Sequence, residues 1–333
     1  MDANFVSKLL KLRQFHRNAA APERNLARAA ATGVFVAVLA VGAPMVMVAA
    51  AQAQDTAAEE AAHRAAVLAH LPPDAAKRAF SAQAGAAPGP ARAIGSYTRG
   101  CVAGATALPA DGANWQVMRP SRNRAWGHPV LIAALERLAA EAAGTTGWPG
   151  LLVGDISQPR GGPMLTGHES HQLGIEADIW LTPMPDRRLS AAERDEMPAT
   201  NLVAKSGDDV DRKVWRPEHQ KVLEAAARSP GVGRIFVNAA IKRALCREAG
   251  TDRDWLRRIR PWWGHNYHFH LRLTCPQGEP GCQDQPPPAG SDGCGKELDW
   301  WFTPEAKHPK PGPPGRPLLV SDLPAACAAL VGR

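Results

Sequence analysis

Residues 266–273 alternate between polar and apolar side chains, which is the pattern of a half-buried β-strand. Successive side chains of a strand point to opposite faces, so His268 and His270 lie on one face together with Arg272. The aromatic and aliphatic residues between them lie on the other face and are expected to pack into a core. The pattern therefore predicts a strand that presents two imidazoles side by side.

A second strand is predicted over residues 176–180, where Glu176 and Asp178 share the polar face. His171 comes shortly before it. On one helix, His171 and Asp178 would lie two turns apart, roughly 10 Å along the axis, which is too far to bind one ion. If His171 lies in a loop and Asp178 on the strand that follows, the two side chains can converge.

The other periodic segments predict short strands and helices in mixed order. Strands are expected near residues 116–118, 151–155 and 234–237, and helices over residues 129–143, 217–229, 239–248 and 252–258. The polar, irregular residues 183–211 are expected to form a loop near the site. The chain is thus expected to have an α+β fold, in which a small antiparallel sheet carries a zinc site on one face and packs its other face against helices.

The two ends of the chain differ in composition from its centre. Residues 1–53 have a basic region and an apolar run that ends in Ala51-Gln52-Ala53, which predicts a cleaved signal peptide and export to the periplasm; a retained anchor is the alternative. Residues 54–93 are rich in alanine and are expected to be a linker or a marginal surface helix. The globular domain would cover residues 94–302, followed by a proline-rich tail at 303–333 that is tethered by Cys327.

Charge and cysteine content narrow the class of protein. The formal charge is +7, but residues 1–53 carry six Lys or Arg and two Asp or Glu, which leaves a net charge of +3 for the rest. This charge does not indicate a basic surface for nucleic-acid binding. Six cysteines in an exported chain predict three disulfides, and fifteen pairings are open. Thiolate zinc sites are built on Cys-x-x-Cys pairs, and the sequence has none.

Five of the eleven histidines fall within two short segments, residues 168–171 and 265–270. Imidazole and carboxylate ligands suit zinc, and a catalytic zinc keeps three protein ligands and one water. Ordinary hydrogen-bonded histidines are the alternative, but that explanation suits a single histidine better than a cluster of five beside Asp178. Ser170 lacks the Gly-x-Ser-x-Gly frame of a nucleophilic serine.

The two histidine segments also resemble a known family, the penicillin-insensitive murein endopeptidases. These belong to a wider group of lysostaphin-type, D-Ala-D-Ala and hedgehog-like zinc folds. The segments that carry the resemblance are Gly167-His168-x-Ser170-His171-Gln172-x-Gly174-x-x-x-Asp178-Ile179 and His265-x-x-His268-x-His270. Further matching stretches are Ile94-Gly95-Ser96, Gly127-His128-Pro129, Gly154-Asp155, Cys275-Pro276 and Asp292-Gly293-Cys294-Gly295, and the similarity covers roughly residues 94–302.

The resemblance implies a role for each residue of the cluster. His171, Asp178 and His270 would bind one catalytic zinc ion together with a water. His268, on the same strand face as His270, is the candidate general base or oxyanion-stabilising group, and His265 would orient the water or the substrate carbonyl.

The family also associates His168 with a second zinc at a dimer contact. An Asp and a His that complete that site align here with Ser206 and Asp209, so this chain departs from the family, and lining the cleft is the other role open to His168. A homodimer is accordingly one expectation. The implied disulfides are Cys101–Cys327, Cys246–Cys294 and Cys275–Cys282.

The function that the resemblance implies is a periplasmic zinc endopeptidase that hydrolyses D-alanyl–meso-diaminopimelate cross-links of peptidoglycan and is insensitive to penicillin. One alternative is a D,D-carboxypeptidase that acts on stem peptides. Another is a non-catalytic, zinc-stabilised module that binds the cell wall. The presence of both His265 and His268 beside intact ligands favours catalysis, because a binding module needs no base.

Overall fold

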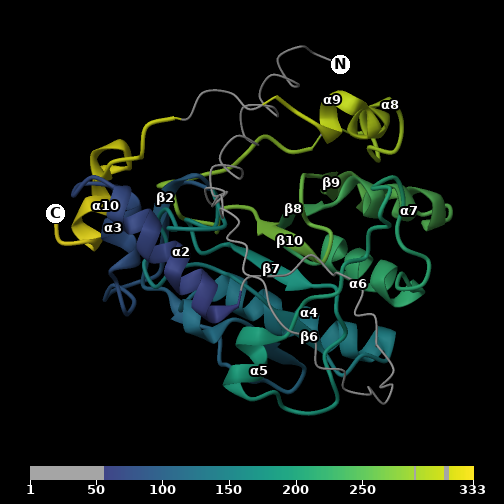
Figure 1. The fold of residues 1–333 in the computed structure, drawn as a ribbon, viewed down its shortest axis with the longest axis horizontal. Helices are drawn as coiled ribbons and strands as arrows, with labels where there is room; N and C mark the ends of the chain where they lie inside the picture. The colour runs from purple at the N-terminus through teal and green to yellow at the C-terminus, as the bar shows by residue number, and fades with distance from the viewer. Residues whose placement is uncertain (1–55, 289, 311–314) are drawn as a thin grey trace, which may run out of the picture.

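The computed structural model describes residues 56–288, 290–310 and 315–333 (Figure 1). The signal peptide expected at residues 1–53 lies outside them. Helices and small sheets are mixed along the chain, which confirms the α+β class. Within the described residues, no helix is long and apolar enough to cross a membrane.

The largest sheet has six strands in the order β4-β6-β7-β10-β8-β9. Their bounds are β4 Trp115–Val117, β6 Leu151–Val153, β7 Glu176–Trp180, β10 His268–Leu273, β8 Val232–Val237 and β9 Ile259–Pro261. The four inner strands, β6, β7, β10 and β8, run antiparallel to one another, as the sequence predicts. The two edge strands pair in parallel with their neighbours, β4 with β6 and β9 with β8, and the sequence did not predict this parallel pairing.

The apolar face of this sheet packs against two helices, α4 (Pro129–Thr146) and α6 (Pro217–Arg228). Ala177 of β7 and Phe269 of β10 are fully buried there, in the same cluster as Leu138 of α4. Fully burying one such large apolar side chain contributes about 1.5–3 kcal/mol. Because strand side chains alternate, packing of this face turns the neighbouring positions, which include Asp178 and His270, to the other side.

The ends of α4 follow from its sequence. Pro129 occupies the first helical position, where its missing N–H is not needed, and His128 Nδ1 accepts a hydrogen bond from Val130 N at 3.2 Å. Gly147 ends the helix at φ +75°, a left-handed conformation that glycine adopts without steric cost. The His128 Nε2 atom lies 2.8 Å from Glu279 Oε1, so this histidine has a structural role.

The remaining elements surround this core. The small sheets are β11-β1-β2 (Cys282–Gln283, Arg92–Ser96, Arg99–Ala103) and β3-β5 (Thr106–Ala107, Trp126–Gly127). The other α-helices are α2 Ala57–His70, α3 Ala76–Ser81, α5 Ala191–Glu196, α7 Ala239–Glu248, α8 Lys296–Asp299, α9 Pro304–Lys307 and α10 Ala325–Leu330. Short 3₁₀ helices are η2 Pro120–Arg122, η3 Asp254–Arg258, η4 Trp300–Phe302 and η5 Val320–Asp322.

The two ends of the described chain pack against each other, and Figure 1 shows α3 beside the yellow α10. Phe80 of α3 is fully buried in a cluster with Val320, Leu323 and Cys327. Ala76 N donates to Leu318 O at 2.8 Å. The segment expected to be a linker or marginal helix thus contains two helices, and α3 and the end of the expected tail bury each other's few apolar side chains.

The structure contains the three disulfides that the resemblance implies, Cys101–Cys327, Cys246–Cys294 and Cys275–Cys282. The first joins residues 226 positions apart, and the last joins residues 7 apart. In the loop-entropy model the first contributes about 5 kcal/mol and the last about half as much, because a longer loop loses more entropy on closure.

Replacing both Cys101 and Cys327 with serine is therefore expected to lower the melting temperature clearly while zinc binding is retained, since neither cysteine lies near the histidine segments in sequence and neither is one of the clustered residues. Thermal denaturation followed by metal analysis checks this. The matched control replaces Cys275 and Cys282 with serine and should lower the melting temperature less. An equal effect of the two double variants would contradict the loop-length argument.

Candidate active site

The register of β7 and β10 brings the two predicted segments together. His270 lies opposite Asp178, and Arg272 lies opposite Glu176. All four side chains are on the sheet face that points away from the α4 and α6 core, and all four residues are buried. Residues about ninety positions apart in sequence thereby form one cluster.

His171 is held in place by its backbone and by its ring. Its φ is +64°, a left-handed conformation that is uncommon outside glycine. The Glu176 Oε2 atom accepts a hydrogen bond from the His171 backbone N–H at 2.6 Å, and Nδ1 of the ring lies 2.5 Å from Ile156 O. A carbonyl only accepts, so Nδ1 carries the proton, and the lone pair of the ring is on Nε2.

Glu176 also fixes the ring of His270 through a hydrogen bond. Its Oε1 atom lies 2.8 Å from His270 Nε2 and accepts from Arg272 Nε at 2.7 Å. Burial raises the pKa of Glu176, but Arg272 and His270 outweigh that effect, so the pKa lies well below its usual value and the carboxylate is charged. His270 therefore donates from Nε2 and keeps the lone pair on Nδ1. Such a carboxylate–histidine pair typically supports a metal ligand.

Three electron-rich atoms consequently face one another. His171 Nε2 lies 3.0 Å from His270 Nδ1. Asp178 Oδ1 lies 3.4 Å from His171 Nε2 and 3.3 Å from His270 Nδ1. Ligand atoms about 2.0–2.2 Å from one tetrahedral zinc ion would be about 3.3–3.6 Å apart. Asp178 Oδ1 is buried and has no hydrogen-bond partner. These residues therefore fit a zinc ion, which would supply the missing partner.

Asp178 is charged, as a metal ligand must be. Burial alone would raise its pKa, but the imidazoles of His268, His171 and His168 outweigh burial and hold the pKa well below its usual value. The side-chain ligand atoms of His168, His171 and Asp178 also lie close enough to one another to hold a metal ion. His168 Nδ1 is 3.7 Å from Asp178 Oδ2, so His168 lies at the edge of the three-atom cluster.

His268 also lies beside Asp178, and His265 lies next to His268. His268 Nε2 is 3.5 Å from Asp178 Oδ2, and its buried Nδ1 has no hydrogen-bond partner. The His265 ring centre is 4.8 Å from that of His268, and its Nδ1 donates to Trp263 O at 2.8 Å. Burial lowers the pKa of both imidazoles, so both are neutral near neutral pH. The structure thus brings all five predicted histidines into one site.

The residues that align with the family's second zinc site lie in other contacts. Asp209 forms an ion pair with Arg247 at 3.0 Å, and Ser206 Oγ accepts from Asp208 N at 3.3 Å. An aromatic cluster borders the site, in which the Phe236 ring lies 5.4 Å from His270 and 5.6 Å from Trp262.

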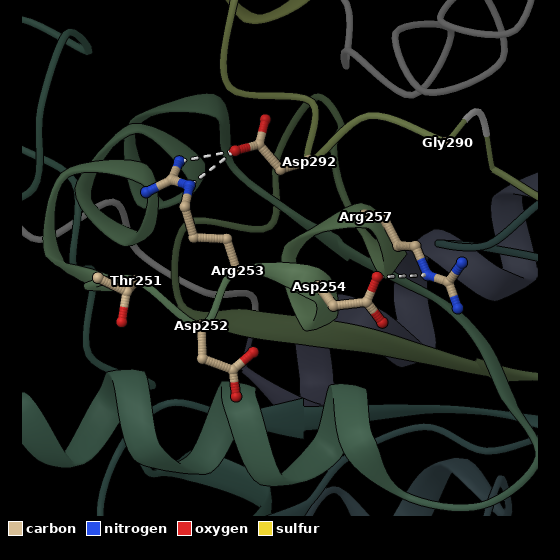
Figure 2. Close-up of a pocket in the computed structure, with 7 residues that line it drawn as sticks. All are labelled: Thr251, Asp252, Arg253, Asp254, Arg257, Gly290 and Asp292. Atoms are coloured by element: carbon tan, nitrogen blue, oxygen red, sulfur yellow. Dashed lines mark hydrogen bonds and ion pairs between the residues drawn. The ribbon is translucent and has the colours of Figure 1, made fainter.

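A separate pocket of about 510 Å³ lies at η3 and is shown in Figure 2. Its charged residues largely pair with one another, since Arg253 binds Asp292 at 2.8 Å and Arg257 lies 3.7 Å from Asp254. None of the five clustered histidines lines this pocket, so it is not part of the site described above.

Two residues of the site, Asp155 and Arg124, had no predicted role. Asp155 follows β6 and binds His168 Nε2 at 2.9 Å, and Arg124 binds the same Asp155 oxygen at 2.9 Å. A carboxylate placed just after a buried strand was the available signal, but nothing in the local sequence connected it with His168.

Comparison with known proteins agrees with this geometry. A family model described as penicillin-insensitive murein endopeptidase matches residues 93–332. The chain belongs to this family. The matched residues include the whole histidine cluster and extend past residue 302 to the C-terminal helix α10.

Curated relatives of this murein endopeptidase family are similar over most of their length. A penicillin-insensitive murein endopeptidase of Haemophilus influenzae is 47% identical over 244 residues, which cover 73% of this chain and 83% of the relative. Its counterpart in Escherichia coli is 43% identical over 245 residues, which cover 73% and 87%. That of Shigella sonnei is 42% identical over 243 residues, covering 71% and 88%. The resemblance seen in the sequence is confirmed.

Proposed function

We propose that the chain is a zinc endopeptidase that hydrolyses D-alanyl–meso-diaminopimelate cross-links of peptidoglycan in the periplasm. The observation that carries the proposal is the convergence of His171 Nε2, His270 Nδ1 and Asp178 Oδ1, which lie 3.0–3.4 Å apart and include a buried oxygen without a partner. The names of the relatives supply the substrate class.

In this proposal His171, Asp178 and His270 hold the zinc ion, and His168 lines the cleft beside them. When bound, zinc supplies Lewis acidity and makes a water molecule acidic near neutral pH. Two nitrogens and one carboxylate oxygen leave a coordination position open for catalysis, unlike the closed set of a structural zinc site.

The other two histidines would handle the proton and the developing charge. His268 is neutral and its Nε2 atom lies 3.5 Å from Asp178 Oδ2, so it can accept a proton from the attacking water and return it to the leaving amine. His265 donates from Nδ1 to Trp263 O, which leaves Nε2 free to orient the water or the substrate carbonyl. Neither step needs an acylated serine, which accounts for insensitivity to penicillin.

Digestion of purified sacculi should remove cross-linked muropeptide dimers, and a chelator should stop this because the three ligand atoms would lose their ion. Mass spectrometry of the muropeptides checks both points, and zinc added back to the chelated enzyme is the control. Removal of terminal D-alanine from monomers, with dimers intact, would instead identify a carboxypeptidase. Unchanged digestion by enzyme shown to be metal-free would rule out the zinc mechanism.

A further inference from the structure

Helix α2 is unusual because Glu60 is its one buried residue. The helix is rich in alanine and lies N-terminal to residues 93–332, the part that matches the family. Glu60 is 9% exposed. A buried carboxylate is destabilising unless it is paired and hydrogen-bonded, so the partners of Glu60 identify the surface to which the helix is bound.

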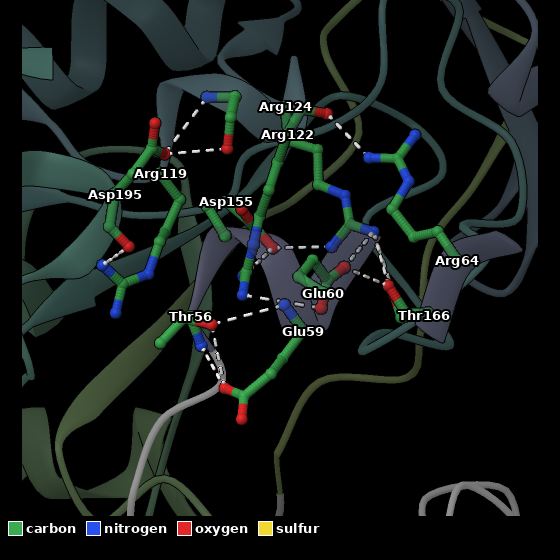
Figure 3. A network of polar contacts seen from close by, with 12 residues as sticks. Thr56, Glu59, Glu60, Arg64, Arg119, Arg122, Arg124, Asp155, Thr166 and Asp195 are labelled. Carbon is green, nitrogen blue, oxygen red and sulfur yellow. Dashed lines mark hydrogen bonds and ion pairs between the residues drawn. The ribbon is translucent and has the colours of Figure 1, made fainter. Parts of the chain in front are cut away.

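Those partners are cationic and polar, as Figure 3 shows. Thr166 Oγ1 donates a hydrogen bond to Glu60 Oε1 at 2.6 Å. The guanidinium groups of Arg122 and Arg124 each lie 3.8 Å from the same carboxylate. One turn further along α2, Arg64 donates to Arg122 O at 3.5 Å. The helix is therefore docked mainly by polar contacts around two arginines.

The same two arginines hold Asp155. Arg124 lies 2.9 Å and Arg122 3.3 Å from its Oδ2 atom. Burial raises the pKa of Asp155, but Arg124 and Arg122 outweigh burial and hold the pKa well below its usual value. Glu60 and Asp155 thus share one pair of cations in a region where neither the acids nor Arg124 are open to solvent.

Asp155 in turn sets the orientation of His168. The oxygen that binds both arginines also lies 2.9 Å from His168 Nε2, and a charged carboxylate only accepts. His168 therefore donates from Nε2, and its Nδ1 lone pair is directed to the region of Asp178 Oδ2, 3.7 Å away. The continuous series of contacts is Glu60, the arginine pair, Asp155, His168 and the ligand cluster.

We propose that Glu60 is a positioning residue of the active site, so that α2 forms part of the working enzyme although it lies outside the family-matched residues. Glu60 and Thr166 fix Arg124 and balance the arginine charge, which leaves Asp155 Oδ2 available to His168. Without the Glu60 charge, Thr166 still accepts from Arg124, but Asp155 is the one carboxylate left between the two arginines, and its hydrogen bond to His168 weakens. The inference rests on the proposed function for its effect on turnover but not for its effect on His168.

The test uses the full chain and the variants Glu60→Gln, Asp155→Asn and their combination. The control is Glu59→Gln, which makes the same change at the neighbouring exposed residue and keeps a side chain that can complete the capping box with Thr56. One readout is the slowly exchanging Nε2 proton of His168 in ¹⁵N-edited NMR, assigned by its loss in His168→Ala. The other is kcat and KM on a cross-linked muropeptide dimer.

Glu60→Gln is expected to weaken or remove the His168 proton signal and to lower kcat about 3- to 10-fold, with KM nearly unchanged. Asp155→Asn, one contact nearer, should lower kcat about 10- to 100-fold. In the Asp155→Asn background, Glu60→Gln should have no further effect, because both act through one hydrogen bond. Glu59→Gln should match the wild type in both readouts.

Several results would overturn the proposal. An intact His168 signal and unchanged kcat in Glu60→Gln would make Glu60 a contact of helix docking alone. An equal loss in the Asp155→Asn background would indicate a general effect on folding, and a rise in kcat would make α2 a cover over the cleft. If the wild type cleaves no dimer, the proposed function fails, but the NMR readout still decides whether Glu60 positions His168.

Discussion

Alanine at Asp178 is expected to remove both bound zinc and peptidase activity. In the proposed site the carboxylate supplies one of three converging ligand atoms, and it is the only anion among them. Two neutral imidazoles hold a divalent ion poorly, and without zinc the enzyme loses its means of acidifying water, so kcat/KM should fall by about 10³-fold or more. His171→Ala and His270→Ala should behave alike, since each removes one nitrogen ligand.

Metal analysis and a muropeptide assay on the same preparations check this prediction. Circular dichroism should show a folded protein, because the core between the sheet and α4 and α6 and the three disulfides do not depend on the ion. The matched control is Asp252→Ala, which removes an exposed carboxylate from an ion pair with Arg228. Full zinc occupancy in any of the three ligand variants would show that its ligand assignment is wrong.

His268→Ala should separate the base from the ligands. Its Nε2 atom is 3.5 Å from Asp178 Oδ2 and does not belong to the three-atom cluster, so zinc should remain close to one ion per chain. Turnover should fall by about 10²-fold or more, the usual scale for loss of a general acid–base group. The buried Nδ1 of His268 lacks a partner, so the substitution leaves few broken hydrogen bonds.

Zinc content and single-turnover rates measured on His268→Ala decide between the two roles. His308→Ala, at an exposed position outside the cluster, is the control and should retain full turnover. Loss of zinc in His268→Ala would make His268 a ligand and would reopen the role of His270. Full turnover with zinc retained would require a different proton acceptor, and His265 would be the next residue to replace.

If α2 positions His168, then part of the catalytic apparatus lies N-terminal to the family-matched residues 93–332. Glu60 lies only a few residues after residue 53, where the predicted signal peptide would end. Changes at that end of the protein would then reach the metal site through charged side chains. Glu60 is the one buried residue of α2, so its contact with the arginines is the path by which such changes would act.

The sequence by itself determined the type of chemistry and the face of each strand that carries it. Strand side chains alternate with a period of two, so placing His268 and His270 on one face needed only the pattern of residues 266–273. The start of α4 was similarly local, since Pro129 begins the helix, and the apolar spacing predicted it to residue 143, three residues short of its end at Thr146. The motifs also identified the family before any contact was known.

Tertiary structure alone decided how those residues meet. Local sequence does not specify strand register, and it is register that places His270 opposite Asp178 and Arg272 opposite Glu176. The left-handed backbone of His171 depends on a hydrogen bond from its N–H to a buried carboxylate on the next strand. Glu60, Arg124 and Asp155 form ion pairs across as many as 95 sequence positions, and an alanine-rich helix with two adjacent glutamates carries no local sign of which one makes that contact. Long-range packing fixes such pairings, because the free energy that selects them comes from burial and charge compensation between distant segments rather than from the conformational preference of either one.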